Sequence, residues 1–248
     1  MRFAALLLLL AGLGVAAAPA VGLASGRELP ERYRRPPWSK ASLTVGHPNA
    51  GWQARAKKLR RTRQLRVKAG SEERVYGHPA LVLMLRRSAR DVARSAKGAV
   101  MLVGDLSTRE GGALSGHHSH QSGRDADVGF YALDAAGKRV LPEAFVSYGA
   151  DGRARDGSGL VFDDRTNALL LLAWAKDQRA GLRRVFVANA LRRRLIAQGR
   201  KLSGWEAHAA AVERLLEQPE NASTHDDHFH VRIACPPGQE AICREESR

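Results

Sequence analysis

Cysteine is scarce in this sequence, and its scarcity excludes several kinds of protein. The 248 residues contain two cysteines, too few for a scaffold held by several disulfides or for a zinc site built from cysteines alone. Beyond the N-terminal stretch, no apolar run is long enough to span a bilayer. The sequence also lacks internal repeats and a nucleotide-binding Gly-rich loop, which argues against repeat proteins and dinucleotide-binding enzymes.

Acidic residues are few relative to basic ones. The chain has 25 Asp and Glu against 40 Lys and Arg, which gives a formal charge of +15 at pH 7. Eight basic residues and no acid fall in the segment Arg55–Lys68. Such a segment can bind nucleic acid, but this one lacks the interleaved aromatic side chains of single-strand binders. We therefore expect a solvated basic surface that anionic polymers of a cell wall attract, and no nucleic-acid partner.

The first 24 residues have the layout of a secretory signal peptide. Arg2 precedes an apolar run from Phe3 to Ala18, and small residues follow up to Ala24. The alternative is a membrane anchor, but glycines interrupt the run and it is shorter than the roughly 20 residues that a span requires. We expect cleavage after Ala18, Ala20 or Ala24, export, and no stable membrane anchor in the mature protein.

The two cysteines, Cys235 and Cys243, lie close together near the C-terminus. In an oxidising compartment they can form a disulfide around a short loop, whereas in a reducing compartment they remain free thiols. Because the N-terminus predicts export, we expect the disulfide.

The rest of the sequence predicts an α+β fold. Residues 25–78 contain scattered prolines and glycines and are expected to be an irregular basic segment before a folded domain over 79–248. Helical periodicity is present over 79–97, 164–181 and 190–218. Strand-like runs occupy residues 99–106, 124–131, 182–189 and 228–235. Because these elements do not alternate as a regular βαβ repeat, we expect a single domain with a small, mostly antiparallel sheet flanked by helices.

Six of the nine histidines fall in two short clusters that the fold must bring together. Each cluster lies beside acids; the residues are His117, His118, His120, Asp125 and Asp127 in the first, and His225, Asp226, Asp227, His228 and His230 in the second. A lone histidine is most often a surface residue or a satisfied core residue, but two clusters beside acids indicate a shared site. We expect His118 to face solvent and the isolated His47, His78 and His208 to be structural.

The expected strands direct both clusters toward one cleft. Side chains alternate along a strand, so His228 and His230 share a face, while the apolar residues between and after them pack on the core. The strand over 124–131 presents Asp127 in the same way. Gly123 supplies the bend that lets His120 fold back toward Asp127.

Two histidines and one carboxylate form a ligand set that suits zinc. Three protein ligands leave a coordination position for water, which is typical of catalytic rather than structural zinc sites. Zinc lowers the pKa of water to about 7 and polarises a carbonyl, and a nearby imidazole can pass a proton to a leaving amine. The clusters therefore predict a zinc site, at the cleft of the sheet, that hydrolyses an amide bond. Asp125, Asp226 and Asp227 either orient imidazoles or are solvated, and the sequence leaves both readings open.

Both motifs resemble those of a known family. The sequences HxxHQSGxDxD over His117–Asp127 and HDDHFHV over His225–Val231 are similar to the motifs of the penicillin-insensitive murein endopeptidases. These belong to a wider group of zinc peptidases with an HxxxxxxD and an HxH motif. The D-Ala-D-Ala peptidases of that group typically have Ser, Ala and Glu where this chain has His118, Asp125 and Asp227. The departures favour the endopeptidase branch.

The resemblance also implies a role for each site residue. The zinc ligands would be His120, Asp127 and His230, the general base would be His228, and His117 and His225 would help to hold the substrate or the tetrahedral intermediate. The implied reaction is zinc-dependent hydrolysis of the D-alanyl–meso-diaminopimelyl cross-links of peptidoglycan. The domain over 79–248 would then be a zinc peptidase that acts in the periplasm.

Other functions remain open from the sequence. A DD-carboxypeptidase on the same scaffold would release free D-Ala and leave cross-links intact. A non-catalytic zinc-binding module would hold cell-wall peptide without cleaving it, although the presence of His228 as a candidate base argues against this. A basic nuclease with a His-rich metal site would fit the charge and would show salt-sensitive DNA binding.

Overall fold

The computed structural model describes residues 27–220 and 223–245. The signal peptide expected over residues 1–24 lies outside these residues and stays a prediction. Within the described residues, no helix combines the length and hydropathy that a membrane crossing requires.

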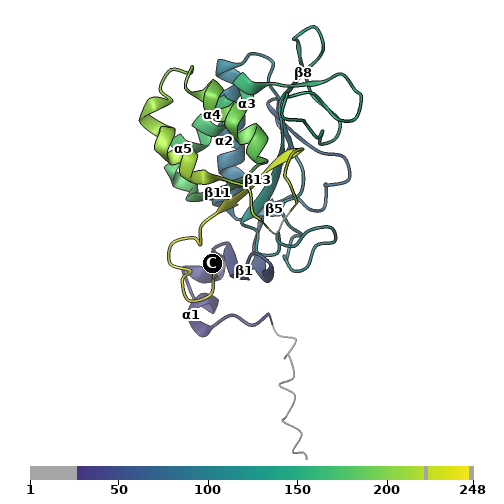
Figure 1. Ribbon diagram of the computed structural model, residues 1–248. Coiled ribbons are helices and arrows are strands. Elements are labelled where there is room, and N and C mark those ends of the chain that lie inside the picture. Colours follow the sequence, from purple (N-terminus) through teal and green to yellow (C-terminus); the bar gives the residue numbers. More distant parts are fainter. Residues whose placement is uncertain (1–26, 221–222, 246–248) are drawn as a thin grey trace, which may run out of the picture.

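A six-stranded sheet forms the centre of the molecule (Figure 1). Its strands in spatial order are β12 (Leu216–Glu217), β11 (Leu182–Phe186), β13 (His228–Ile233), β7 (Asp125–Gly129), β6 (Met101–Val103) and β4 (Leu65–Val67). The three inner ladders are antiparallel, whereas β11–β12 and β4–β6 are parallel. The α+β class is found as expected. Three of the five ladders are antiparallel, and the parallel pairing at both edges makes the sheet mixed. Each outer strand joins its neighbour through a helical crossover, as parallel pairing requires.

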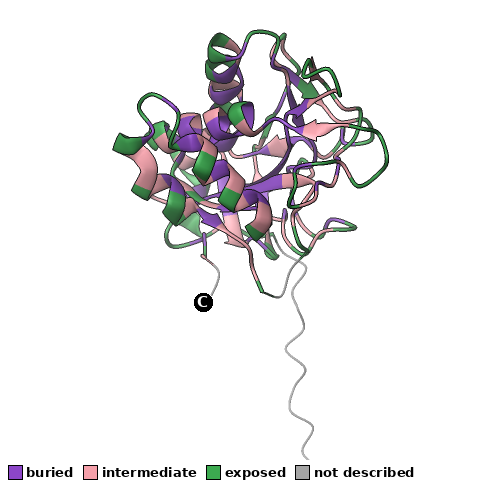
Figure 2. Cartoon of the chain, turned by 45° about the horizontal axis from the view of Figure 1, so that its top comes forward, coloured by how far each residue is buried: buried purple, intermediate pink, exposed green. Residues whose placement is uncertain are grey.

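Helices pack together on one side of this sheet, with the loops around β8 on the other side of the view (Figure 1). They are α2 (Pro79–Ser95), α3 (Asp164–Lys176), α4 (Asn189–Gly199) and α5 (Ala209–Leu215), while α1 (Glu31–Arg34) lies apart near the first described residues. The apolar face of β13 points to these helices, and the ring of Phe229 contacts that of Trp174 on α3 at 5.5 Å between centroids. Figure 2 shows the buried stretches concentrated in the sheet and on the inner sides of the helices.

The two long helices begin where local chemistry favours a start. The ring of His78 accepts a hydrogen bond from the backbone of Ala80, so this isolated histidine caps α2, as its expected structural role requires. Asp163 caps α3 through the backbone N–H of Thr166. Helix α3 ends at Lys176 rather than at Gly181, because residues Gln178–Ala180 tighten into a 3-10 turn, η2.

The segment 25–78, which was expected to be irregular, contains short strands. Besides β4 these are β1 (Leu43–His47), β2 (Ala50–Ala54), β3 (Lys57–Lys58) and β5 (Tyr76–Gly77), and a 3-10 turn, η1, covers Trp38–Lys40. β1 pairs with β2, and β3 with β5, both antiparallel. β3, β4 and β5 have two or three residues, too few for an alternation pattern to be read from sequence. Glycines interrupt the pattern of β1 and β2. The boundary expected after residue 78 stays a prediction, although β4 of this segment belongs to the main sheet.

The remaining elements are small. A three-stranded sheet contains β10 (Val161–Phe162), β8 (Ala132–Leu133) and β9 (Arg139–Val140), and a 3-10 turn, η3, covers Glu206–His208. Cys235 and Cys243 form the expected disulfide, with 5.7 Å between their Cα atoms. The loop that this disulfide closes lies against β1, where the backbone N–H of Gly46 donates to the carbonyl of Ile242.

Candidate metal centre

Strands β13 and β7 bring the second histidine cluster opposite Asp127. In their antiparallel ladder, His230 pairs with Asp127 and His228 with Gly129. Phe229, between the two histidines, is fully buried in the core. The expected alternation is therefore confirmed, and it directs both imidazoles to the face of the sheet opposite the core.

The loop before β7 brings the first cluster to the same face. His120 on this loop has φ +67° and Gly123 has φ +73°. A Cβ on Gly123 would collide with the side-chain amide of Gln53, so this glycine makes the expected bend. A left-handed backbone costs a residue other than glycine roughly 1–2 kcal/mol. Such strain at a buried histidine is typical of functional sites.

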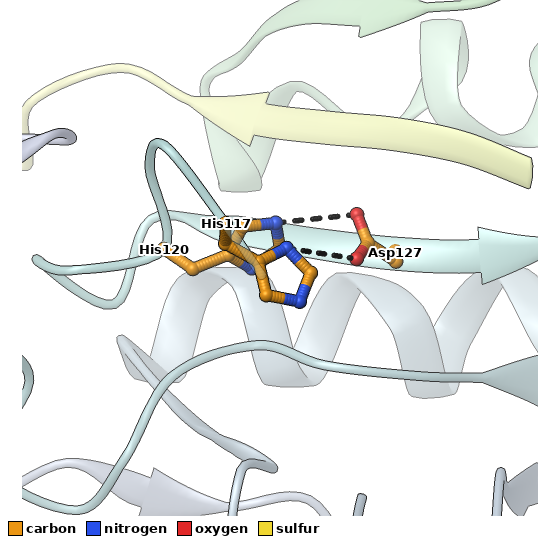
Figure 3. A group of neighbouring side chains, drawn as sticks. All are labelled: His117, His120 and Asp127. Carbon is orange, nitrogen blue, oxygen red and sulfur yellow. Dashed lines mark ion pairs between the residues drawn. The ribbon is translucent and has the colours of Figure 1, made fainter. Parts of the chain in front are cut away.

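Four imidazoles converge on the carboxylate of Asp127. His120 Nε2 and His230 Nδ1 each lie 3.2 Å from Asp127 Oδ1, and His228 Nε2 lies 3.4 Å from the same oxygen. His117 Nδ1 lies 3.7 Å from the other oxygen, Oδ2. Figure 3 shows the rings of His117 and His120 facing Asp127 from the loop. The two clusters predicted to share a site thus meet around one acid.

The other ring nitrogens of the two most buried histidines are occupied. His120 Nδ1 donates to the carbonyl oxygen of Leu106 at 2.7 Å, and His230 Nε2 donates to Asp125 Oδ1 at 3.0 Å. In a neutral imidazole one nitrogen carries the proton and the other has a free lone pair. These bonds therefore leave the lone pairs of His120 Nε2 and His230 Nδ1 directed toward Asp127.

His117 and His228 are oriented in the same way. His117 Nε2 contacts Asp105 Oδ2 at 2.9 Å, and His228 Nδ1 contacts Asp227 Oδ1 at 2.6 Å. A carboxylate that accepts from the remote nitrogen of an imidazole fixes its tautomer and makes it more basic, which is the usual arrangement behind metal-binding histidines.

Aromatic rings hold two of the imidazoles from the side. The ring of Phe186 on β11 stacks on His230 at 5.0 Å, and the ring of Phe145 stacks on His228 at 4.9 Å. The ring of His225 lies 5.4 Å from that of His228. His225 has φ +50°, a second histidine of the site with a left-handed backbone.

Asp127 differs from the neighbouring buried acids in its partners. Asp105 pairs with Arg74 at 3.1 Å, and Asp125 pairs with Arg232 at 2.5 Å. Across the described residues, the recorded ion-pair partners of Asp127 are the four imidazoles. A buried carboxylate needs a compensating positive charge, and here a proton on an imidazole or a metal ion can supply it.

The burial of this cluster and its charges shift several pKa values. Burial by itself lowers the pKa of His228, but Asp127 and Asp227 outweigh it and raise that pKa to about 10. Burial would raise the pKa of Asp127, yet the surrounding imidazoles hold it well below its usual range. Burial, together with the neighbouring imidazoles, lowers the pKa of His225 to about 4. In the metal-free protein His228 therefore carries a proton at neutral pH and His225 does not.

The donor set can hold a metal ion. One nitrogen each of His117 and His120 and one oxygen of Asp127 all lie within 4.8 Å of one another. His230 Nδ1 lies 3.2 Å from His120 Nε2. Imidazole nitrogens with a carboxylate oxygen suit zinc and related divalent ions.

The three acids that the sequence left open have separate roles. Asp125 and Asp227 contact imidazoles, as described above, whereas the carboxylate of Asp226 lies 3.8 Å from Arg155. His118 is exposed, as expected. The isolated His47 contacts the backbone carbonyl of Glu245 through Nδ1.

Several residues of the site were not found by sequence reasoning. Asp105, Leu106, Phe145 and Phe186 hold the imidazoles from elements far from the histidine motifs. Asp105 and Leu106 could have been found from the sequence, because the segment 103–107 combines the end of an expected buried strand with a glycine and an acid.

The histidines line a cleft of about 320 Å³. Its walls also include Asn49, Ser119, Arg184, Phe186, Pro219, Ser223 and Arg232. Polar groups that converge at the base of a cleft are typical of a site for a small substrate or a peptide segment.

Comparison with known proteins places the chain in a family. A family model described as penicillin-insensitive murein endopeptidase matches residues 44–248. The protein of that name from Haemophilus influenzae is 31% identical over 175 residues, which cover 67% of this chain and 54% of the relative. Those from Salmonella heidelberg and Escherichia coli O157:H7 are 28% identical and cover 66% of this chain and 56% of theirs. The chain thus spans about half the length of these relatives. Because the family model covers most of its residues, the chain belongs to the penicillin-insensitive murein endopeptidases.

Proposed function

We propose that this protein is a zinc-dependent murein endopeptidase that hydrolyses the D-alanyl–meso-diaminopimelyl cross-links of peptidoglycan. The proposal is supported by family membership and by one observation above all. Three donor atoms, from His120, His230 and Asp127, stand at the corners of a triangle at the base of an open cleft.

The dimensions of this triangle suit zinc. The distances His120 Nε2–Asp127 Oδ1, His230 Nδ1–Asp127 Oδ1 and His120 Nε2–His230 Nδ1 are each 3.2 Å. Zinc bonds of 2.0–2.1 Å in a tetrahedron separate neighbouring ligand atoms by about 3.3 Å. We assign His120, Asp127 and His230 as the ligands. His117, whose Nδ1 lies 3.7 Å from the other oxygen of Asp127, then stands beside the metal rather than on it.

Zinc in this position would supply a Lewis acid that activates water and polarises the scissile carbonyl. In the proposed mechanism the chain's own residues move the protons. His228 would take a proton at Nε2 from the attacking water and deliver it to the leaving amine, while Asp227 fixes the tautomer of His228 through Nδ1. Phe145 keeps this ring in place by stacking. His117 and His225 hold the substrate carbonyl as negative charge develops on its oxygen.

The disulfide supports a setting outside the cytoplasm. Structural disulfides persist in oxidising compartments such as the periplasm, and the Cys235–Cys243 bond closes the loop that packs on β1. We place the protein in the periplasm, where peptidoglycan cross-links are available as substrate.

Defined cross-linked muropeptides test this function. The purified protein should convert dimeric muropeptides into monomers, as identified by mass, and should lose this activity with a chelator and regain it with zinc. His230→Ala should abolish both cleavage and stoichiometric zinc binding. His208→Gln, which alters a histidine on the distant η3 turn, should leave both unchanged.

Other products would point to other functions. Free D-Ala released from a pentapeptide stem, with cross-links intact, would identify a DD-carboxypeptidase. Peptide binding without any product, unchanged by His228→Ala, would identify a non-catalytic binding module. Full activity of His230→Ala would contradict the ligand assignment.

A further inference from the structure

Two arginines extend the histidine face along the sheet. The ladder between β11 and β13 pairs Phe186 with His230, and two residues further along it pairs Arg184 with Arg232. Strand residues two positions apart are separated by about 7 Å. Both arginines line the same cleft as the histidines, so a pair of positive charges lies one strand repeat away from the proposed metal ligand His230.

A β-bulge determines which arginine joins this pair. The register shifts between Leu182 and Arg184, and Arg183 instead reaches toward Glu245, with 3.8 Å between Nε and Oε2. If the register of Leu182 with Ile233 continued without the bulge, Arg183 would stand opposite Arg232. Bulges are frequent beside active sites, where they redirect a side chain. Here the bulge turns Arg183 away, while Arg184 keeps the register of Phe186 and lines the cleft.

Each of the two guanidinium groups is paired with an acid on the neighbouring strand. Arg184 Nη1 donates to Glu217 on β12 at 2.8 Å, and Arg232 Nε donates to Asp125 on β7 at 2.5 Å. Like charges directly across a ladder destabilise a sheet, and the two acids offset that repulsion while both arginines remain in the lining of the cleft. The Arg184 side chain is 24% exposed, so a ligand in the cleft can reach it.

We propose that Arg184, supported by Arg232, forms a carboxylate-binding subsite that selects peptides with a free carboxylate beside the scissile amide. This inference rests on the proposed function and names a substrate feature that the function alone does not require. Arginine suits the role because its planar N–H donors match a carboxylate.

The proposed substrate places a carboxylate beside the scissile amide. meso-Diaminopimelate carries a carboxylate on the carbon that bears the cross-linked amine. Three bonds therefore separate that carboxylate carbon from the scissile carbonyl carbon, a span of at most about 4 Å, so both groups fit within one strand repeat of about 7 Å.

A pair of synthetic cross-linked peptides tests the subsite. The peptides are identical except that the diaminopimelyl carboxylate beside the scissile amide is free in one and amidated in the other. With the zinc-loaded full chain, kcat/KM should be at least tenfold higher for the free carboxylate. Arg184→Gln should bring this ratio close to one, mainly by raising KM for the carboxylate peptide. Arg183→Gln, a matched change on the bulge, should keep the native ratio.

The failure of this inference is distinguishable from failure of the proposed function. Equal cleavage of both peptides by the native protein, or an unchanged ratio in Arg184→Gln, would overturn the subsite and leave the endopeptidase intact. Cleavage of neither peptide would overturn the endopeptidase. The affinities of the two peptides for the metal-free protein, measured by calorimetry, would then test the subsite. A tenfold preference for the free carboxylate that is lost in Arg184→Gln would support it, and equal affinities in the native protein would contradict it.

A second variant guards against an effect on folding. Arg184→Gln leaves Glu217 without its arginine, whereas Arg184→Gln combined with Glu217→Gln removes both charges. If the single variant melts below the assay temperature, the double variant takes its place. Retention of the carboxylate preference in the double variant would contradict the proposal.

Discussion

Asp125 is a buried carboxylate that accepts hydrogen bonds from two of the proposed metal ligands and from an arginine. Its Oδ1 accepts from His230 Nε2 and from Arg232 Nε, and its Oδ2 lies 3.3 Å from the backbone N–H of His120. Burial would raise the pKa of Asp125, but Arg232 and His230 outweigh it and hold that pKa below its usual range. The carboxylate therefore stays charged and fixes both neighbouring imidazoles, one through its ring and the other through its backbone.

We expect Asp125→Asn to weaken zinc binding about 10–100-fold, because groups that orient metal-binding histidines have effects of this size. Competition with a zinc-binding chromophore measures the affinity. Asp226→Asn is the matched control, since its carboxylate lies 3.8 Å from Arg155 and is 24% exposed, and it should change affinity less than twofold. Equal affinities for Asp125→Asn and the native protein would show that His230 needs no such partner.

The sequence predicts the site only in part, for reasons visible at single residues. Alternation along a strand correctly placed His228 and His230 on one face, and the steric demand for glycine correctly placed the bend at Gly123. The left-handed backbone of His120 was not predictable, because it opposes local preference and is held by tertiary contacts. Asp105 was missed because its contact with His117 depends on how the strand ends meet in space.

At the scale of elements, length decides what a sequence can predict. The 17-residue helix α2 and the 13-residue helix α3 show their periodicity over several turns, and both were expected close to their observed starts. The strands β4 and β12, of three and two residues, carry no readable pattern. These two strands form the parallel edges of the sheet, so the mostly antiparallel sheet expected from the sequence lacked the two parallel pairings that the structure contains.

A buried ion pair links α2 to the residues after α3. Arg87 Nε lies 2.6 Å from Asp177 Oδ2, and the two side chains are 18% and 6% exposed. Burial would raise the pKa of Asp177, but Arg87 and Arg179 outweigh it and leave the pKa below its ordinary value. A depressed pKa in the folded state means that the pair stabilises the fold above about pH 4. This stabilisation is lost as the pH falls through the folded-state pKa.

We therefore expect Asp177→Asn to lower the free energy of unfolding by about 1.5–3 kcal/mol at pH 7, the range for hydrogen bonds to charged groups. The difference from the native protein should shrink when urea unfolding is repeated near pH 3. Asp91→Asn, at an exposed pair with Arg94, should change stability by less than about 0.5 kcal/mol. If the difference in unfolding free energy between Asp177→Asn and the native protein grew on acidification, the pKa of Asp177 would be raised in the folded state rather than lowered.

At the scale of the whole molecule, segments from the two ends of the described chain pack on each other beneath the sheet. A small apolar cluster joins Tyr33 and Leu43 to Ile242. The guanidinium of Arg124, which is fully buried, donates to Glu245 Oε2 at 3.0 Å and to the carbonyl of Arg244 at 2.6 Å. Since Arg124 directly precedes β7, the C-terminal loop is anchored at the base of the strand that carries Asp127.

The disulfide should stabilise the contact between these two terminal segments, here called the junction, more than it stabilises the main sheet. Cys235 and Cys243 are separated by 8 positions, and loop closure of that length stabilises the fold by about 2.5 kcal/mol in the chain-entropy model. We expect Cys235→Ser combined with Cys243→Ser to lower the unfolding free energy by about this amount. Hydrogen exchange should quicken over 43–47 and 235–245, where backbone hydrogen bonds join β1 to the loop. Exchange in α2 and α3 should change much less, because these helices pack in the separate main core. Uniform acceleration across both helices would mean that the junction and the sheet unfold as one unit.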